Sequence, residues 1–212
     1  LFAVDAAQSA GVLDINMEEM QNDALAVPGH KGLYGPMGVG MLLLGKGIRP
    51  DTLLEGGNGL DSLSGGMGDD LPERYEPGTL PLPAIAGLRA GIEFVRRVTP
   101  EAIREKETAL GIFLRDALTE LPGVHVAVPH LAGGTVLFRA DGVSSEDIAA
   151  RLDAAGSGIC VRPGFHCAAL AHRTLGTPEG GAVRASFGWF NTRRDAEQLI
   201  QSLRGGLPGR NG

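Results

Sequence analysis

The sequence predicts an α/β protein in two parts, and three patterns support this prediction. Short apolar runs near the start of the chain, each closed by a polar or turn residue, predict the strands of a mostly parallel sheet. Apolar residues then recur at helical spacing between positions 82 and 121, and short strand-like and helix-like stretches alternate beyond that region. We therefore assign residues 1–82 to part of a large domain and residues 83–212 to a smaller C-terminal α+β domain.

The first part contains three apolar runs that we expect to be buried strands. They cover residues 1–4, 24–27 and 39–44. Residues 51–68 are rich in Gly, Ser, Asp and Asn without periodicity, which predicts a long, mobile loop. From Leu82 the apolar residues Ile85, Leu88, Ile92 and Val95 recur at helical spacing, so a helix follows the loop.

The second part opens with a helix after Thr99 and Pro100, an N-cap residue and a first-turn proline. Strands are then expected over residues 124–128, 135–138, 159–162 and 183–187. Helices are expected over residues 146–155, capped by Ser144 or Ser145, over residues 168–175, and from Thr192 onwards. Thr192 and Asp195 resemble a capping box. This order favours helices layered on a mostly antiparallel sheet.

Composition narrows the class of function. The formal net charge is -6 and the pI is near 5.4, so no basic surface is expected for nucleic acid. No apolar run is long enough to predict a membrane span. The two cysteines are too few for a secreted disulfide framework, which favours a reducing compartment and a cytoplasmic location. The chain begins at Leu1 without an initiator methionine, and we expect it to be part of a longer protein.

Lys31 is unusual because it lies among apolar and glycine residues between two predicted buried strands. A buried lysine must be paired, reach solvent, or be used in its neutral form. Asp5 ends the first strand and Lys31 follows the second, so both are expected at one rim of the sheet, where α/β proteins bind ligands. A lysine and an acid there suit pyridoxal 5′-phosphate, with Gln8 as a donor to its phenolic oxygen. Alternatively, Asp5 caps a helix and Gln8 is an ordinary turn residue.

Five segments, in this order, resemble the second half of the cysteine desulfurase/selenocysteine lyase branch of the class V aminotransferases. They are DAAQSAG, GHKGLYGPMGVG, RYEPGTLPLPAIAGL, VRPGFHCAALAHRTLGT and VRASFGWFNT. The resemblance implies a PLP-dependent transferase-like fold. It also implies that Lys31 bonds covalently to the cofactor, Asp5 pairs with the pyridine nitrogen, Gln8 with the phenolic oxygen and His30 with the phosphate. Thr79 would reach the phosphate of a neighbouring subunit, which implies a homodimer.

Cys167 follows His166 on a predicted loop ahead of a short helix. A structural cysteine is one interpretation, whereas an adjacent imidazole and a helix start would favour the thiolate. The resemblance implies that Cys167 takes sulfur from L-cysteine, leaving alanine and a persulfide whose sulfur passes to an acceptor protein. Selenocysteine is the alternative substrate. It also implies that Arg184 binds the substrate carboxylate, with Arg162 assisting. Cys160 is expected in the core.

The cysteine and histidine spacing of Cys167, His166 and His172 matches no strong zinc template, so no metal is predicted. Pro28 stands where the family has a serine or threonine that holds the phosphate, which predicts a different phosphate grip. Two other functions stay open. The chain could belong to an aminotransferase or another PLP lyase, or it could be a catalytically incomplete fragment that acts as an interaction module.

Overall fold

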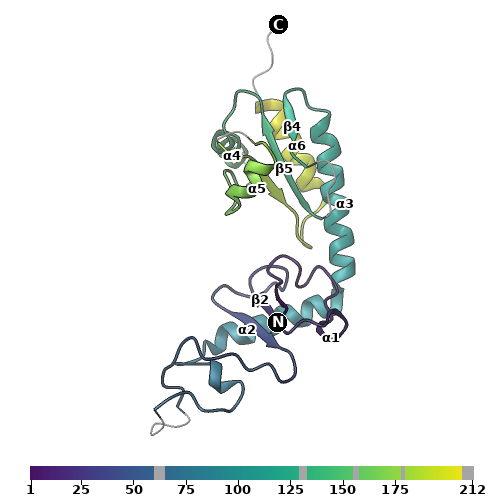
Figure 1. Ribbon diagram of the computed structural model, residues 1–212. Coiled ribbons are helices and arrows are strands. Elements are labelled where there is room, and N and C mark those ends of the chain that lie inside the picture. Colours follow the sequence, from purple (N-terminus) through teal and green to yellow (C-terminus); the bar gives the residue numbers. More distant parts are fainter. Residues whose placement is uncertain (60–64, 129–132, 155–157, 178–179, 207–212) are drawn as a thin grey trace. The chain divides into compact units, whose positions relative to one another are not determined.

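A computed structural model describes residues 1–59, 65–128, 133–154, 158–177 and 180–206 of the chain. These residues form two compact units, Leu1–Glu101 and Ala102–Gly212 (Figure 1). The division falls in the first turn of helix α3 (Pro100–Thr119). The boundary expected after residue 82 instead coincides with the start of helix α2 (Leu82–Val98).

The first unit is built on a three-stranded sheet in the order β1-β2-β3. Its strands are β1 (Ala3–Asp5), β2 (Ala24–Pro28) and β3 (Gly40–Leu44). β1 and β2 are parallel, with Asp5 opposite Ala26, whereas β2 and β3 are antiparallel. The sheet is therefore mixed, because the chain turns back directly from β2 into β3. A short helix, α1 (Met17–Met20), connects β1 to β2.

Helix α2 closes the small core of the first unit. Leu88 of α2 packs with Leu25 and Val27 of β2 and with Leu33. The strands are less buried than predicted, since Leu42 and Leu43 of the edge strand β3 are 56% and 40% exposed. Alternate residues of a strand point to opposite faces, so these two exposures show that β3 is incompletely covered on both sides.

The segment between β3 and α2 forms no strand in the part that the structure describes. Its one helical turn is the 3-10 helix η1 (Glu73–Tyr75). Met67 is buried and its sulfur accepts a hydrogen bond from the Gly56 N–H at 3.4 Å. Residues 60–64 of the predicted loop lie outside the described residues.

The second unit is an α+β layer, as predicted. An antiparallel sheet in the order β4-β5-β6 consists of β4 (Val124–Val126), β5 (Thr135–Ala140) and β6 (Val183–Ser186). Its helices are α3, α4 (Ser145–Ala154), α5 (Ala169–Thr174) and α6 (Arg193–Gly206). Side chains from α3, α4 and α6 share one core with the sheet, including fully buried Leu114, Phe138 and Ile148.

Local signals explain where these elements start. The Ser144 hydroxyl accepts the Asp147 N–H at 3.0 Å, which confirms the predicted cap of α4. Asp195 accepts the Thr192 N–H at 2.8 Å, the reciprocal half of a capping box at the start of α6. Position 155, the predicted end of α4, lies outside the described residues.

The strand predicted over residues 159–162 is wrong. Only Arg162 pairs with a strand, through a single bridge to Arg184 of β6, with N···O distances of 3.0 and 2.8 Å. Beyond the bridge, Pro163 has no N–H to donate, although the Gly164 carbonyl still accepts the Ala182 N–H at 3.2 Å. Residues 159–161 on the other side of the bridge have the composition of a strand but form no strand pairing. No helix among the described residues has the length and apolar character required to cross a bilayer.

Candidate active site

The carboxyl ends of β1 and β2 bring Asp5 and the Lys31 turn to one edge of the sheet. The two strands are parallel, and the Ala6 N–H donates to the Ala26 carbonyl at 2.9 Å. Pro28 ends β2, and His30 and Lys31 follow it directly. The structure thus places the acid and the lysine at the same rim, where the ends of parallel strands commonly form ligand sites.

Gln8 lies in a helical turn that begins at Asp5. The Asp5 Oδ1 accepts the Ala7 N–H at 2.9 Å, and the Ala6 carbonyl accepts the N–H groups of Ser9 and Ala10 at 3.2 and 3.0 Å. The carboxylate therefore caps this turn, as the alternative interpretation held, while remaining exposed at the sheet edge.

The turn that carries Lys31 is rigidly built from backbone contacts. The Gly35 N–H donates to the Gly29 carbonyl at 2.8 Å, and the Tyr34 N–H donates to the Lys31 carbonyl at 3.0 Å. A side chain at Gly11 would overlap the Gly32 carbonyl, so the backbones of the Gln8 and Lys31 turns touch. The two turns consequently hold each other in register.

Helix α2 supports the Lys31 turn from the other side. A methyl group at Gly91 would overlap the Leu33 carbonyl oxygen and lie 2.9 Å from the Tyr34 carbonyl carbon. Leu33 itself is 8% exposed and belongs to the core of the first unit. Glycine at position 91 thus allows the helix to pack directly against the backbone of the turn.

Of the outcomes considered for a lysine in this apolar stretch, the structure shows that Lys31 reaches solvent. Its side chain is exposed, as are those of Asp5, Gln8 and His30. The apolar neighbours that suggested burial point elsewhere, since Val27 and Leu33 enter the core while the lysine lies beyond the strand end. Thr79 is also exposed, between η1 and α2, and the described structure records no hydrogen bond from it to the sheet-edge residues.

Cys167 lies in the second unit, in a tight turn between the Arg162 bridge and α5. His166 and Cys167 both have left-handed backbones, with φ of 54° and 60°. This conformation costs roughly 1–2 kcal/mol per non-glycine residue, so other contacts must hold the turn. One of these is the Ala168 N–H, which donates to the Phe165 carbonyl at 2.8 Å.

Two arginines make the surroundings of Cys167 positive. The Arg162 Nη2 lies 3.4 Å from the Cys167 Sγ, at hydrogen-bonding distance. Arg184 stands opposite Arg162 in the bridge, and its Nε is buried without a hydrogen-bond partner among the described residues. Neither guanidinium forms an ion pair with a carboxylate in the part of the chain that the structure describes. These donors are the ones that a carboxylate or another anion accepts from.

His166 links Cys167 to the interior of the second unit. Its Nε2 lies 2.8 Å from the Arg162 carbonyl, and its Nδ1 lies 3.2 Å from the Nε2 of His172. Partial burial lowers the pKa of His166 below its ordinary value, and the positive charges of Arg184 and Arg162 lower it further. His166 is consequently held as the neutral imidazole.

The sequence interpretation missed His172 and Thr177 as partners of this turn. His172 is 3% exposed, and its Nδ1 lies 2.8 Å from the Thr177 hydroxyl. The available signal was the spacing of the two histidines across the short helix α5, which we considered only as a metal pattern. Among the described residues, no group of three or more potential ligands is arranged to hold a metal ion.

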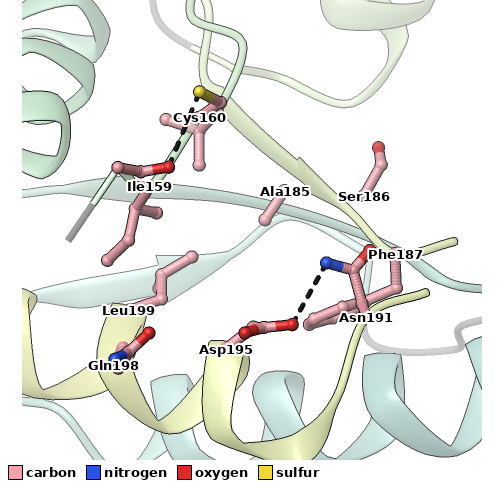
Figure 2. A pocket seen from close by; sticks show the side chains of 11 residues that line it. Ile159, Cys160, Ala185, Ser186, Phe187, Asn191, Asp195, Gln198 and Leu199 are labelled. Atoms are coloured by element: carbon pink, nitrogen blue, oxygen red, sulfur yellow. Dashed lines mark hydrogen bonds between the residues drawn. The ribbon is translucent and has the colours of Figure 1, made fainter.

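Cys160 is exposed, so its expected place in the core is wrong. Its Sγ contacts the Gly158 carbonyl at 3.7 Å, at the rim of a pocket beside α6 (Figure 2). The residue lies in the extended segment that fails to pair fully with β6. Without strand partners, this segment leaves the thiol open to solvent. Asn191 and Asp195 line the same pocket, with Nδ2 and Oδ2 3.3 Å apart (Figure 2).

Comparison with protein families gives one match that covers most of the chain. The profile of the aminotransferase class-V family matches residues 1–199. A probable cysteine desulfurase of Methanothermobacter thermautotrophicus is 34% identical over 96% of this chain and 52% of the relative. A probable cysteine desulfurase of Staphylococcus aureus is 30% identical over 96% of this chain and 50% of the relative. The chain thus spans about half the length of the curated relatives it matches.

Solved structures give the same result. The apo structure of a cysteine desulfurase from Thermococcus onnurineus NA1 matches with a TM-score of 0.82 and 34% identity, covering 97% of this chain and 52% of that chain. The Escherichia coli cysteine desulfurase CsdA matches with a TM-score of 0.85 and 28% identity, covering 96% and 50%. These neighbours confirm the predicted α/β, PLP-dependent transferase-like fold.

Proposed function

The chain belongs to the class V aminotransferase family, and on that premise we propose that it is part of a pyridoxal 5′-phosphate-dependent cysteine desulfurase. The observation that carries the proposal is the Cys167 thiol 3.4 Å from Arg162, with Arg184 opposite Arg162 in the bridge and neither arginine paired with a carboxylate among the described residues. The cysteine desulfurases of similar sequence support the same assignment.

The donor set at the sheet edge fits pyridoxal phosphate. Lys31 supplies an exposed primary amine on a rigid turn, and Asp5 supplies a carboxylate for a protonated ring nitrogen. Gln8 and His30 supply an amide and an imidazole at the same edge for the phenolic oxygen and the phosphate. Bound there, the cofactor would supply an electron sink for charge that develops on the substrate carbon.

The arginines would orient the substrate. A guanidinium presents parallel N–H donors that match a carboxylate, and the Arg184 Nε has a hydrogen bond still to make. We assign Arg184 as the residue that binds the substrate α-carboxylate. Arg162 would assist this binding, since it also contacts the Cys167 sulfur. A substrate held in a fixed orientation loses less entropy on reaching the transition state, which lowers the barrier of the reaction.

Cys167 would accept the sulfur. A bond forms between the Cys167 Sγ and the sulfur of L-cysteine as the carbon–sulfur bond of the substrate breaks. The electron pair leaves with the carbon, which takes up a proton to give alanine, and Cys167 becomes a persulfide. The Arg162 Nη2, 3.4 Å from the Cys167 Sγ, would hold this sulfur in place for the attack.

Further assignments rest on the same family. We propose that the enzyme is a homodimer in which Thr79 reaches the cofactor phosphate of the other subunit, that selenocysteine can replace cysteine, and that an acceptor protein collects the persulfide sulfur. The two exposed free thiols suit a reducing, cytoplasmic environment.

The proposal is tested first at Lys31. Purified protein mixed with pyridoxal phosphate is expected to develop the visible absorption band of the bound cofactor, and Lys31→Ala is expected to abolish it. Lys46→Ala removes another exposed lysine of the first unit and is the matched control. A band of equal strength in Lys31→Ala would contradict the assignment of this lysine.

The second test concerns the reaction. The enzyme that contains this chain is expected to release sulfide from L-cysteine in the presence of a thiol reductant. Cys167→Ala should stop the release while the absorption band persists, and Cys160→Ala should release sulfide as the unaltered enzyme does. Undiminished release from Cys167→Ala would exclude the proposed role of Cys167 and favour an aminotransferase or another lyase.

A further inference from the structure

The Cys167 turn is connected to buried His172 and half-buried Thr177, two residues that the proposed reaction does not use. His172, on α5, is almost fully buried, and Thr177 follows the same helix. A histidine in such a place must satisfy both ring nitrogens. It does so through His166 on one side, at 3.2 Å, and Thr177 on the other, at 2.8 Å.

The hydrogen-bond partners determine which ring nitrogens of His166 and His172 carry a proton. The Arg162 carbonyl can only accept, so the Nε2 of His166 carries a proton. The Nδ1 of neutral His166 is then an acceptor, and the Nε2 of His172 donates to it. The Thr177 hydroxyl has one proton and two acceptors in reach, the His172 Nδ1 at 2.8 Å and the His172 carbonyl at 3.1 Å. With the Nε2 of neutral His172 donating to His166, the Nδ1 carries no proton, and we assign the hydroxyl proton to this shorter contact. All three groups are satisfied in one neutral arrangement.

This series of hydrogen bonds ends at Arg162, the arginine that contacts the Cys167 thiol. Arg162 is anchored by its bridge to Arg184, and its carbonyl is held by His166 while its Nη2 contacts the Cys167 Sγ. His166 and Cys167 meanwhile occupy left-handed backbone conformations that their side chains do not favour. The contact from His172 is therefore one of the interactions that offset this strain.

We propose, resting on the proposed function, that His172 and Thr177 are positioning residues for Cys167. They hold His166 in its Nε2–H tautomer, and His166 in turn fixes the turn that keeps the Cys167 sulfur beside the Arg162 guanidinium. Neither residue contacts the sulfur. The edge-on packing of Phe165 against the His172 ring, with centroids 5.4 Å apart, supports the same turn.

The test compares two polar substitutions of His172 in a Cys160→Ser background, where Cys167 is the sole thiol. The amide nitrogen of His172→Gln can take the place of the ring Nε2 and donate to His166. The amide of His172→Asn reaches only the position of Nδ1. Two quantities are measured on each variant of the whole chain. The first is the rate at which iodoacetamide alkylates Cys167 at neutral pH. The second is the nitrogen chemical shifts of the His166 ring, which report its tautomer.

We expect the Gln variant to retain the wild-type rate and the Nε2–H tautomer of His166. We expect the Asn variant to be alkylated roughly tenfold more slowly, the factor that corresponds to losing a hydrogen bond involving a charged group, and to show a mixture of tautomers. Thr177→Val, which removes the hydroxyl at similar size, should change both measurements in the same direction. It also provides the test if His172→Asn does not fold.

Equal behaviour of the Gln and Asn variants would overturn the proposal, because it would show that His172 acts only by filling space. Unchanged alkylation and tautomer in Thr177→Val would also overturn it. Neither measurement needs the cofactor or turnover. If the expected shifts are seen but the enzyme that contains this chain releases no sulfide, the proposed function is contradicted and the positioning role stays intact.

Discussion

His166 is the single residue whose charge the fold controls most directly. Its pKa lies below the ordinary value of 6.5, because burial and the nearby positive charges of Arg184 and Arg162 disfavour the imidazolium. Protonation would also place a second N–H opposite the His172 donor, so acid should loosen the turn that holds Cys167.

This shift predicts how stability depends on pH. The unfolded chain binds a proton at His166 near pH 6.5 while the folded chain does not, so the stabilising contribution is complete above that pH. It is lost as the pH falls from about 6.5 through the lower folded pKa. Urea denaturation of the wild type and His166→Gln from about pH 8 to about pH 5 measures it.

The difference in unfolding free energy between the two proteins should shrink or reverse toward acid pH. His30→Gln, which removes an exposed histidine of the first unit, is the control for loss of a titratable ring. A constant difference across the range would contradict the stated cause of the shift.

The sequence predicted the location of a residue correctly where that location depends on the position of the residue along a strand. Asp5 and Lys31 lie at one sheet edge because parallel strands align their carboxyl ends. The prediction failed where the outcome depends on what covers a residue. Cys160 has apolar neighbours in sequence, but these neighbours do not surround it in space, and the pairing of His172 with His166 depends on how the chain turns after α5.

Among the elements, α2 has the most specific role, because it supports the Lys31 turn through glycine. We predict that Gly91→Ala destabilises the protein by about 1–3 kcal/mol, because the added methyl group must displace the Leu33 carbonyl. This cost should exceed the gain of about 1 kcal/mol in helix propensity that alanine brings.

Gly87→Ala is the matched control on the same helix. Its methyl group would approach the Pro36 side chain at 3.0 Å, a contact that a small shift can relieve. Thermal and urea unfolding should therefore show Gly87→Ala to be clearly more stable than Gly91→Ala. Equal stabilities would mean that the helix does not pack against the turn as closely as described.

The start of α6 gives a second prediction at this scale. Asp195→Ala removes the acceptor of the Thr192 N–H and should cost about 1 kcal/mol of unfolding free energy. Asp195→Asn keeps an oxygen at that place and should cost less. Denaturant titration of both variants decides the point, and an alanine variant as stable as the asparagine variant would show that the cap contributes nothing.

Element prediction from sequence was good for helices and weaker for strands. The helices carry long apolar stripes and caps, and all of those predicted are present within the described residues. Residues 159–162 satisfy the composition of a strand, but pairing requires a partner with free donors and acceptors. The segment makes one bridge, at Arg162, and composition alone does not show that the residues before it stay unpaired.

For the whole molecule, the two groups of candidate residues belong to different units. Asp5, Gln8, His30 and Lys31 lie in the first unit, and Arg162, Cys167 and Arg184 lie in the second. A desulfurase requires both groups to serve one substrate, so the proposal predicts that a change in one unit blocks chemistry in the other. The chain spans about half the length of its relatives, and the enzyme that contains it is the object to test.

Locating the transferred sulfur is the most direct measurement of this claim. The enzyme is incubated with pyridoxal phosphate and L-cysteine, and its peptides are analysed by mass spectrometry without reductant. We predict one added sulfur on the peptide that contains Cys167, and none in Lys31→Ala. Sulfur found on Cys160 instead, or on Cys167 regardless of Lys31, would contradict the account.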